Sequence, residues 1–198
     1  MPLTDLRSQM LGFLATAQGA SSDFDLNPDL PHPTSKTRPA GVLVLIRETA
    51  DAQEVLLTKR SAKLRHHPGQ IAFPGGKQDP EDADVIETAL REAREEVGLP
   101  DGLVDVLGTL PTHITVTSFD VTPVVALLKE SFEVVCEAGE VDEAFWVPLD
   151  HLLDADKYAV QSRRWSGRWR SYYTVPFGPY YIWGATARML RTLAEAAQ

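Results

Sequence analysis

Three glutamates within residues 91–99, REAREEVGL, have the types and the spacing of a metal site. Glu92, Glu95 and Glu96 stand at positions i, i+3 and i+4, so a helix projects all three carboxylates toward one side. Like charges at this spacing repel one another unless a cation lies between them. Hard divalent ions such as Mg²⁺ prefer oxygen ligands and bridge carboxylates to substrate phosphates. The pattern therefore indicates a site for metal and phosphate, and the alternative is a solvated acidic helix face.

The segment just upstream favours the metal site. Residues 73–76 have the sequence FPGG, and an acidic loop, 77–84, joins them to the glutamate-rich helix. Adjacent glycines permit backbone conformations closed to other residues and let a ligand or metal approach closely. This succession of strand, Gly-Gly turn, loop and helix resembles the Nudix box of the Nudix hydrolases.

The match is close in the second half of the box, whose pattern is R-E-U-x-E-E-x-G-U, with U a bulky aliphatic residue. The chain supplies Arg91, Glu92, Ala93, Glu95, Glu96, Gly98 and Leu99 there, with the small Ala93 at a U position. The first half departs from the pattern. Counted from Gly76, Asp82 takes the first acid position, but eight residues instead of seven separate it from Arg91. The role of Asp82 is therefore left open.

A second run, 56–76, LLTKRSAKLRHHPGQIAFPGG, is similar to the segment that precedes the box in the coenzyme A pyrophosphatases of this family. That pattern is L-L-T-x-R-S, three residues, R, three residues, G-Q-x-x-F-P-G-G, and the chain matches its specified positions. Segments 118–126 and 179–190 also resemble this subfamily. The resemblance thus extends over about residues 40–195, nearly the whole chain.

The resemblance implies an enzyme that uses Mg²⁺ or Mn²⁺ to hydrolyse the diphosphate of coenzyme A or its thioesters. The products would be 3′,5′-adenosine bisphosphate and 4′-phosphopantetheine or its acyl form. Glu92, Glu95 and Glu96 are the implied metal ligands, Glu92 and Glu96 foremost, with a carbonyl of Gly75 or Gly76 as a further ligand. Two alternatives stay open: another substrate such as ADP-ribose or a dinucleotide, and a Nudix module that binds such a ligand without cleaving it. Loss of box glutamates would mark the latter, and all three are present.

Nudix enzymes commonly take one more carboxylate, as ligand or base, from a loop far along the chain. The candidates in this chain are Glu137, Glu140 and Glu143. We favour Glu140, because it lies in a glycine-containing turn just before a predicted strand. Arg91 either contacts phosphate or pairs with Glu95 and Glu87, and we favour the pairing, which would hold the glutamates in place.

A local basic cluster lies at residues 59–67 of this acidic chain. Arg60 and Arg65 match the subfamily run, and we expect them to bind coenzyme A phosphates through charge-assisted hydrogen bonds. His66 and His67 do not indicate a zinc site, because adjacent histidines point apart on a strand and neither a cysteine nor a third histidine accompanies them.

Arginine and tryptophan alternate in residues 163–173, RRWSGRWRSYY, which predicts a hairpin with Ser166 and Gly167 at its turn. Such a pattern can stack nucleic-acid bases. A surface hairpin, a dimer contact or a lid over an adenine is favoured instead, because the net charge of the chain is −9. Trp183 is expected in the core.

The composition excludes several classes of protein. A net charge of −9 disfavours a nucleic-acid binder. Cys136 is the single cysteine and cannot form an internal disulfide, so we expect a core residue and a reducing compartment. The chain has neither an apolar run of membrane-spanning length nor a signal-peptide pattern, which predicts a cytoplasmic protein without membrane contact. A homodimer is left open.

We expect two parts: an N-terminal helix and a proline-rich wrapping segment in 1–39, and a Nudix domain in 40–198. On the central helix, Val85, Ala89, Ala93 and Val97 form an apolar stripe with Glu92 and Glu96 at its shoulder and Glu95 further round. The predicted fold is a Nudix-type α/β/α sandwich with a mixed sheet. Strands are predicted at about 40–47, 54–60, 70–73, 103–110, 121–129, 132–136 and 143–147, and helices at about 4–18, 83–97, 150–154 and 182–197.

Overall fold

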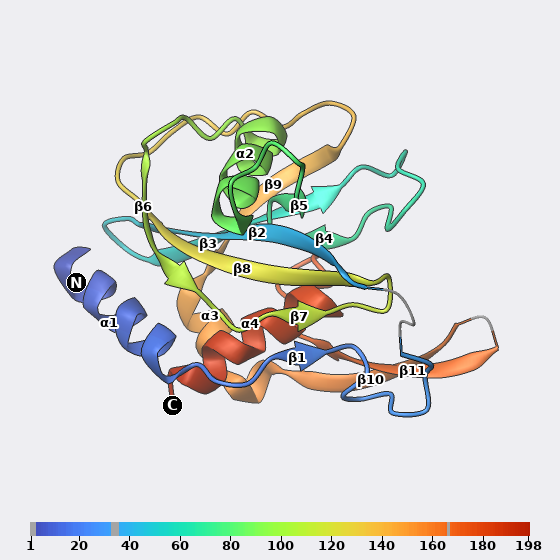
Figure 1. The fold of residues 1–198 in the computed structure, drawn as a ribbon. Coiled ribbons are helices and arrows are strands. Elements are labelled where there is room, and N and C mark those ends of the chain that lie inside the picture. Colours follow the sequence, from blue (N-terminus) through green and yellow to red (C-terminus); the bar gives the residue numbers. More distant parts are fainter. Residues whose placement is uncertain (1–2, 33–35, 166) are drawn as a thin grey trace.

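A computed structural model describes residues 3–32, 36–165 and 167–198, and it forms a mixed β-sheet with helices on both faces (Figure 1). This is the predicted α/β/α arrangement, with the predicted N-terminal helix. The elements in chain order are α1 (Leu3–Thr16), β1 (Ser21–Ser22), β2 (Arg38–Glu48), β3 (Gln53–Arg60), β4 (Ile71–Ala72), β5 (Gly75–Lys77), α2 (Val85–Val97), β6 (Val104–Thr109), β7 (His113–Ile114), β8 (Phe119–Leu128), β9 (Val141–Pro148), α3 (Leu149–Leu153), the 3₁₀ helix η1 (Ala155–Lys157), β10 (Ala159–Trp165), β11 (Arg168–Thr174) and α4 (Ala185–Ala196).

Two long strands, β2 and β8, run parallel through the middle of the sheet. On one side β3 pairs antiparallel with β2, and β4 and β9 pair antiparallel with β3. On the other side β6 and β7 pair antiparallel with β8, and β1 pairs parallel with β7. The short strand β5 pairs with the start of β2, which places Gly76 opposite Gly41. Strands β10 and β11 form a separate antiparallel hairpin.

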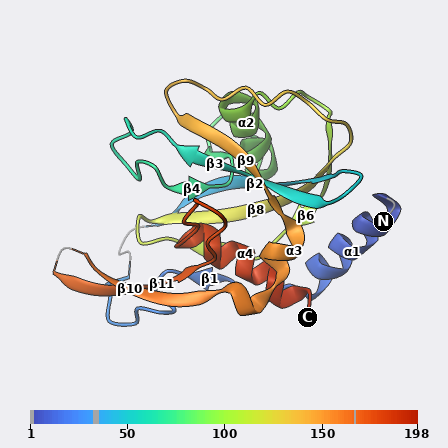
Figure 2. The ribbon, with the colours of Figure 1, turned by 180° about the vertical axis from the view of Figure 1, so that it is seen from behind.

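The sheet separates two hydrophobic cores. Strand β2 shows the period-2 alternation that this requires, since Leu43 and Leu45 face one core while Val44 and Ile46 face the other. Helix α2 covers the first core with Ala89, Ala93 and Val97 of its predicted apolar stripe, whereas Val85 is only partly buried. Helices α1, α3 and α4 cover the second core (Figure 2). One face of the sheet thus carries the glutamate helix alone among the described helices.

Helix α2 is fixed at both ends by side-chain and backbone caps. The Asp84 carboxylate accepts hydrogen bonds from the backbone N–H groups of Ile86 and Glu87, both at 2.9 Å. Gly98 ends the helix in the left-handed conformation, φ 69°, as the sequence predicts. The start of the helix lies so close to β2 that a Cβ on Gly41 would collide with the Val85 carbonyl oxygen. These contacts set the height of the glutamates above the sheet.

Some local predictions were wrong. Residues 132–136 do not form a strand; the backbone N–H groups of Val135 and Glu137 instead donate to the carbonyls of Val97 and Glu96 at the end of α2. Cys136 is only partly buried. The proline-rich segment contains a strand, β1, that its composition did not predict. Two predicted features, Pro33 of that segment and the turn residue Ser166, lie outside the described residues.

The described helices include none that is both long and apolar enough to cross a membrane.

Candidate active site

Glu96 is a buried carboxylate at the edge of the sheet, with only 3% of its surface exposed. The Gly75 backbone N–H donates to its Oε2 at 3.1 Å, and Arg60 Nη1 lies 3.8 Å from its Oε1. Burial raises the pKa of Glu96 to about 7, and the negative charges of Glu92 and Glu140 contribute to this rise. The hydrogen bond from Gly75 and the positive charge of Arg60 partly offset the rise. The fold therefore keeps an acid where its negative charge is poorly solvated.

Glu92 lies one helical turn before Glu96 and is half-buried against the Gly-Gly turn. A Cβ on Gly76 would stand 2.6 Å from Glu92 Oε2 and closer still to Oε1, so only glycine leaves room for this carboxylate. Burial raises the pKa of Glu92; Arg91 opposes the rise, while the charges of Glu95 and Glu140 add to it. The carboxylates of Glu92, Glu96 and Glu140 thus repel one another across one region.

Glu95, the third glutamate of the box, is 58% exposed in its side chain and faces Arg91. Among the described residues, no three His, Cys, Asp or Glu side chains lie close enough together to hold a metal ion by themselves. The structure therefore brings Glu92 and Glu96 toward Glu140 and leaves Glu95 at the surface, as the helical wheel predicts.

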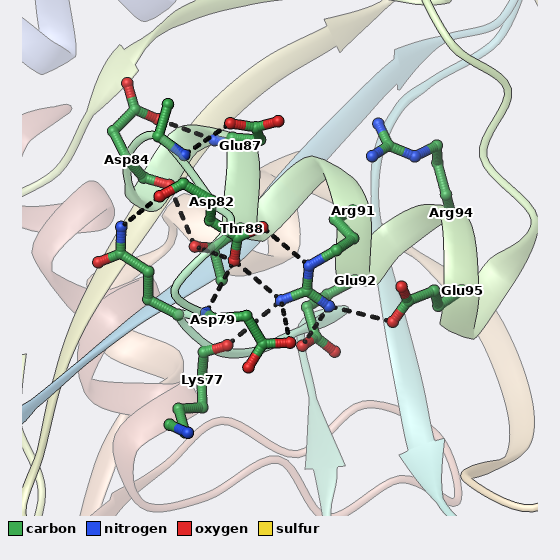
Figure 3. A network of polar contacts seen from close by, with 12 residues as sticks. Lys77, Asp79, Asp82, Asp84, Glu87, Thr88, Arg91, Glu92, Arg94 and Glu95 are labelled. Carbon is green, nitrogen blue, oxygen red and sulfur yellow. Dashed lines mark hydrogen bonds and ion pairs between the residues drawn. The ribbon is translucent and has the colours of Figure 1, made fainter.

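Arg91 holds the acidic loop to helix α2 (Figure 3). Its Nε and Nη2 donate to the two oxygens of Asp82 at 2.9 and 3.0 Å, and its Nη1 donates to Glu92 at 3.0 Å and Glu95 at 3.1 Å. The predicted pairing with Glu95 is confirmed, but the pairing with Glu87 was wrong, since Glu87 accepts from the Ala83 N–H at 2.7 Å. Arg91 therefore restrains Glu92 and ties it to the acidic loop.

The same contacts explain Asp82, whose position in the box is one residue out of register. Thr88 Oγ1 and the Asp79 N–H donate to Asp82 Oδ2, both at 2.9 Å. The Arg91 guanidinium holds the pKa of Asp82 well below its usual range. Asp82 thus serves as the fixed counter-charge of Arg91, a role that spacing alone did not reveal.

We expect Arg91→Lys to lower the catalytic rate by about tenfold or more, because lysine cannot form the bidentate pair that restrains Glu92. Steady-state rates at saturating Mg²⁺ measure the effect. Arg94→Lys is the matched control, since Arg94 lies on the same helix as Arg91 but pairs with the exposed Asp101 in the turn after that helix. Equal rates for both variants would show that the Arg91 network does not position the carboxylates.

The three candidate loop glutamates differ in what they contact. Glu137 closes its own turn, since its Oε2 accepts from the N–H groups of Gly139 and Glu140. Glu143 accepts a hydrogen bond from the Tyr180 hydroxyl. Glu140 is exposed, and its charge reaches both Glu92 and Glu96. Glu140 as the additional carboxylate stays a prediction.

A cavity of about 410 Å³ adjoins these carboxylates. Arg60 and Gly75 belong to both places, since they line the cavity and also contact Glu96. Gln70 and Phe73, from the run upstream of the box, line it as well. Arg65 lies exposed on the loop before β4 and is not among the lining residues, so its contact with substrate stays a prediction.

Some lining residues were not predicted at the site, whereas His67 belongs to the basic cluster 59–67. His67 belongs to the cavity wall, and burial together with the charge of Arg60 lowers its pKa. Trp183 also lines the cavity instead of the core. Asp23 and Asn27 enter from the N-terminal segment. Nothing local in the sequence marks them, because their place depends on the pairing of β1 with β7.

The family model of the NUDIX domain matches residues 37–168. The chain belongs to the Nudix family. It is 40% identical over 174 residues to an uncharacterised Nudix hydrolase NudL of Enterobacter sp. (strain 638), covering 85% of this chain and 88% of the relative. It is 41% identical over the same length to a NudL of Salmonella paratyphi B.

Solved Nudix structures share the fold. A Nudix hydrolase from M. smegmatis, RenU, aligns with a TM-score of 0.51 and 28% identity over 61% of this chain and 76% of that one. A C. elegans Ap4A hydrolase aligns with a TM-score of 0.50 and 25% identity over 56% and 80%. As a Nudix hydrolase, the chain cleaves phosphoric anhydrides of nucleoside diphosphate derivatives.

Nudix hydrolases generally use divalent metal ions, and the residues present fit such an ion. The site offers hard oxygen donors, which Mg²⁺ and Mn²⁺ prefer. Glu92 and Glu96 are partly or fully buried and repel each other, which a cation would relieve. The lack of a side chain at Gly76 makes room for the Glu92 carboxylate. Glu92 and Glu96 would therefore hold the ion.

Proposed function

We propose that the chain hydrolyses the diphosphate of coenzyme A or its thioesters, with Mg²⁺ or Mn²⁺, to 3′,5′-adenosine bisphosphate and (acyl-)4′-phosphopantetheine. One observation carries the proposal: the run 56–76, which resembles the coenzyme A pyrophosphatases, supplies the cavity wall next to Glu96. Arg60, Gln70 and Phe73 of this run all line the cavity. The part of the sequence that points to the substrate is thus also the part that would contact it.

Each group has a distinct part in this proposal. When bound, the divalent ion would neutralise the diphosphate and activate water. Arg60, between Glu96 and the cavity, would donate hydrogen bonds to the diphosphate. Arg91 keeps Glu92 in place, and Glu140 would act as a further ligand or base. Glu95 as a ligand, Arg65 as a phosphate contact and the Gly75 or Gly76 carbonyl as a ligand belong to the same proposal.

A product assay by mass spectrometry tests the substrate. Coenzyme A, acetyl-coenzyme A, ADP-ribose and diadenosine polyphosphates are offered in parallel, in ¹⁸O-water. We expect coenzyme A and its acetyl form to be cleaved at similar rates, with label in one phosphate product and none in acetate. Attack at phosphorus leaves the thiol end untouched. Cys136→Ser should leave the rate unchanged, since no step uses this thiol.

Two results would contradict the proposal. Faster cleavage of ADP-ribose or a dinucleotide would replace coenzyme A by another nucleoside diphosphate derivative. Label in free acetate would identify thioester hydrolysis in place of diphosphate cleavage.

A further inference from the structure

The wall of the cavity opposite the run 56–76 is formed by the β10–β11 hairpin and the segment before α4. Trp165, Arg170 and Tyr172 line the cavity from the hairpin, and Trp183 lines it from the segment. Tyr172 and Trp183 meet edge to face, with ring centroids 5.0 Å apart. Trp165 and Trp183 are tilted by 30° at 5.9 Å. One wall of the cavity is therefore aromatic and carries a guanidinium group.

The register of the hairpin explains which side chains face inward. Arg163 pairs with Arg170 and Trp165 with Arg168, so these four share one face of the hairpin. Trp169 belongs to the other face and is 70% exposed, whereas Trp165 is 42% exposed. The two tryptophans thus form a natural pair for comparison, one at the cavity and one at solvent.

Arg170 carries an unsatisfied donor. Its Nε is buried, and within the described chain it has no hydrogen-bond partner, which costs free energy in a folded protein. Asp23, the acidic residue of the lining, is already engaged by the Val116 N–H at 2.9 Å and His113 Nε2 at 3.2 Å. The hairpin therefore brings to the cavity a cation whose buried Nε–H is available to a ligand.

The position of Arg170 is fixed by the N-terminal segment. Asn27 Oδ1 accepts from the Ser171 N–H at 2.7 Å, and Asn27 Nδ2 donates to the Ser171 carbonyl at 2.9 Å. These two bonds restrain the backbone of β11 at the residue between Arg170 and Tyr172, and they join residues 144 positions apart in the sequence. The guanidinium is thus held on a restrained strand, where it can discriminate between ligands.

We propose that this hairpin wall binds the nucleoside of the substrate, with Arg170 recognising a phosphate monoester on its ribose and the aromatic side chains packing against the base. The proposal rests on the proposed function, in which Arg60 serves the diphosphate at the other wall. Coenzyme A has this distribution of charge, because its ribose separates the 3′-phosphate from the diphosphate. Arginine suits a phosphate monoester by its planar, multidentate donors, and indole rings suit a purine.

Binding of adenosine 3′,5′-bisphosphate and of AMP, measured by calorimetry with the full chain, tests this assignment. Arg170→Gln should weaken bisphosphate binding by about tenfold to a hundredfold, as expected for lost bonds to a charged group, and AMP binding by less than about threefold. Arg164→Gln is the control, because Arg164 lies on the opposite face of the hairpin. Trp165→Ala should weaken both probes, and Trp169→Ala neither.

Kinetics give a second readout. Arg170→Gln should raise KM for coenzyme A but not for dephospho-coenzyme A, and leave kcat within about twofold, because uniform binding is lost away from the reacting atoms. Arg170→Lys, which keeps the charge, should retain part of the preference and serves if the glutamine variant does not fold. An equal loss of affinity for the bisphosphate and for AMP in Arg170→Gln would overturn the assignment. It would also be overturned if 4′-phosphopantetheine bound more tightly than AMP, competed with AMP and required Trp165.

The two proposals fail separately. Arg170-dependent binding of the bisphosphate without cleavage of coenzyme A would leave this inference standing and refute the proposed function. If the chain cleaves coenzyme A but Arg170→Gln changes neither bisphosphate affinity nor KM, the proposed function stands and this inference is refuted.

Discussion

Glu96→Gln is expected to reduce hydrolysis by at least about a hundredfold at saturating Mg²⁺. The substitution removes the negative charge with which, in the proposed function, Glu96 holds the catalytic ion. Without metal the variant should be as stable as the parent or more so. The native carboxylate is buried beside other acids, and a neutral amide of the same shape avoids burying that charge. It can still accept the Gly75 N–H.

Steady-state rates and denaturant unfolding without metal measure the two effects. Glu81→Gln is the control, since Glu81 is an exposed acid of the loop before α2 and should change neither. Loss of activity together with loss of stability would mean that Glu96 mainly supports the fold. Normal turnover would remove Glu96 from the metal site.

Helix α2 was predictable because its signals are local. Ala89, Ala93 and Val97 repeat at the helical period and are buried as predicted. Gly98 ends the helix where the sequence places its stop. The same wheel correctly separated Glu96, at the shoulder of the stripe, from the exposed Glu95. A residue's burial on a helix follows from its angle to the apolar face, so the sequence carries this information directly.

The partners of Arg91 were only partly predictable. Helical spacing gives Glu95 at i+4, and the structure confirms it. The stronger partner, Asp82, lies on the loop and reaches Arg91 because hydrogen bonds from Thr88 and Asp79 shape that loop. Spacing rules for helices do not describe loop conformation. A one-residue shift in the box therefore looked like a departure, although Asp82 still meets Arg91.

The cavity lining outside the run 56–76 could not be predicted from the sequence, for a different reason. Asn27 contacts Ser171, and strand β1, which directly precedes Asp23, pairs with β7, far along the chain. Such contacts depend on the global pairing of segments and leave no periodic trace. Trp183 shows the consequence. Its apolar surroundings predicted a core residue, but the hairpin and the sheet leave a space in front of it.

Gly76→Ala is the second substitution with a large expected effect, and it separates the chemistry from the fold. Gly76 does not have a positive φ, so alanine fits its backbone. The added Cβ would collide with the Glu92 carboxylate, which is the far end of a flexible side chain and not backbone. Glu92 should therefore turn away while the protein stays folded. We expect hydrolysis to fall by about a hundredfold, since in the proposed function a displaced Glu92 would no longer hold the ion against the diphosphate.

Two other glycines provide the contrast. Gly12→Ala on α1 meets nothing within 4 Å, so it should keep full activity and gain about 0.5–1 kcal/mol of stability from helix propensity. Gly75→Ala should lose the fold, because Gly75 has φ +154° and its Cβ would stand 2.5 Å from the Gly41 carbonyl oxygen. Thermal unfolding, Mn²⁺ affinity and rates are measured for all three variants. A folded Gly76→Ala variant with normal Mn²⁺ affinity and normal turnover would show that the position of Glu92 beside the Gly-Gly turn is not what the reaction requires.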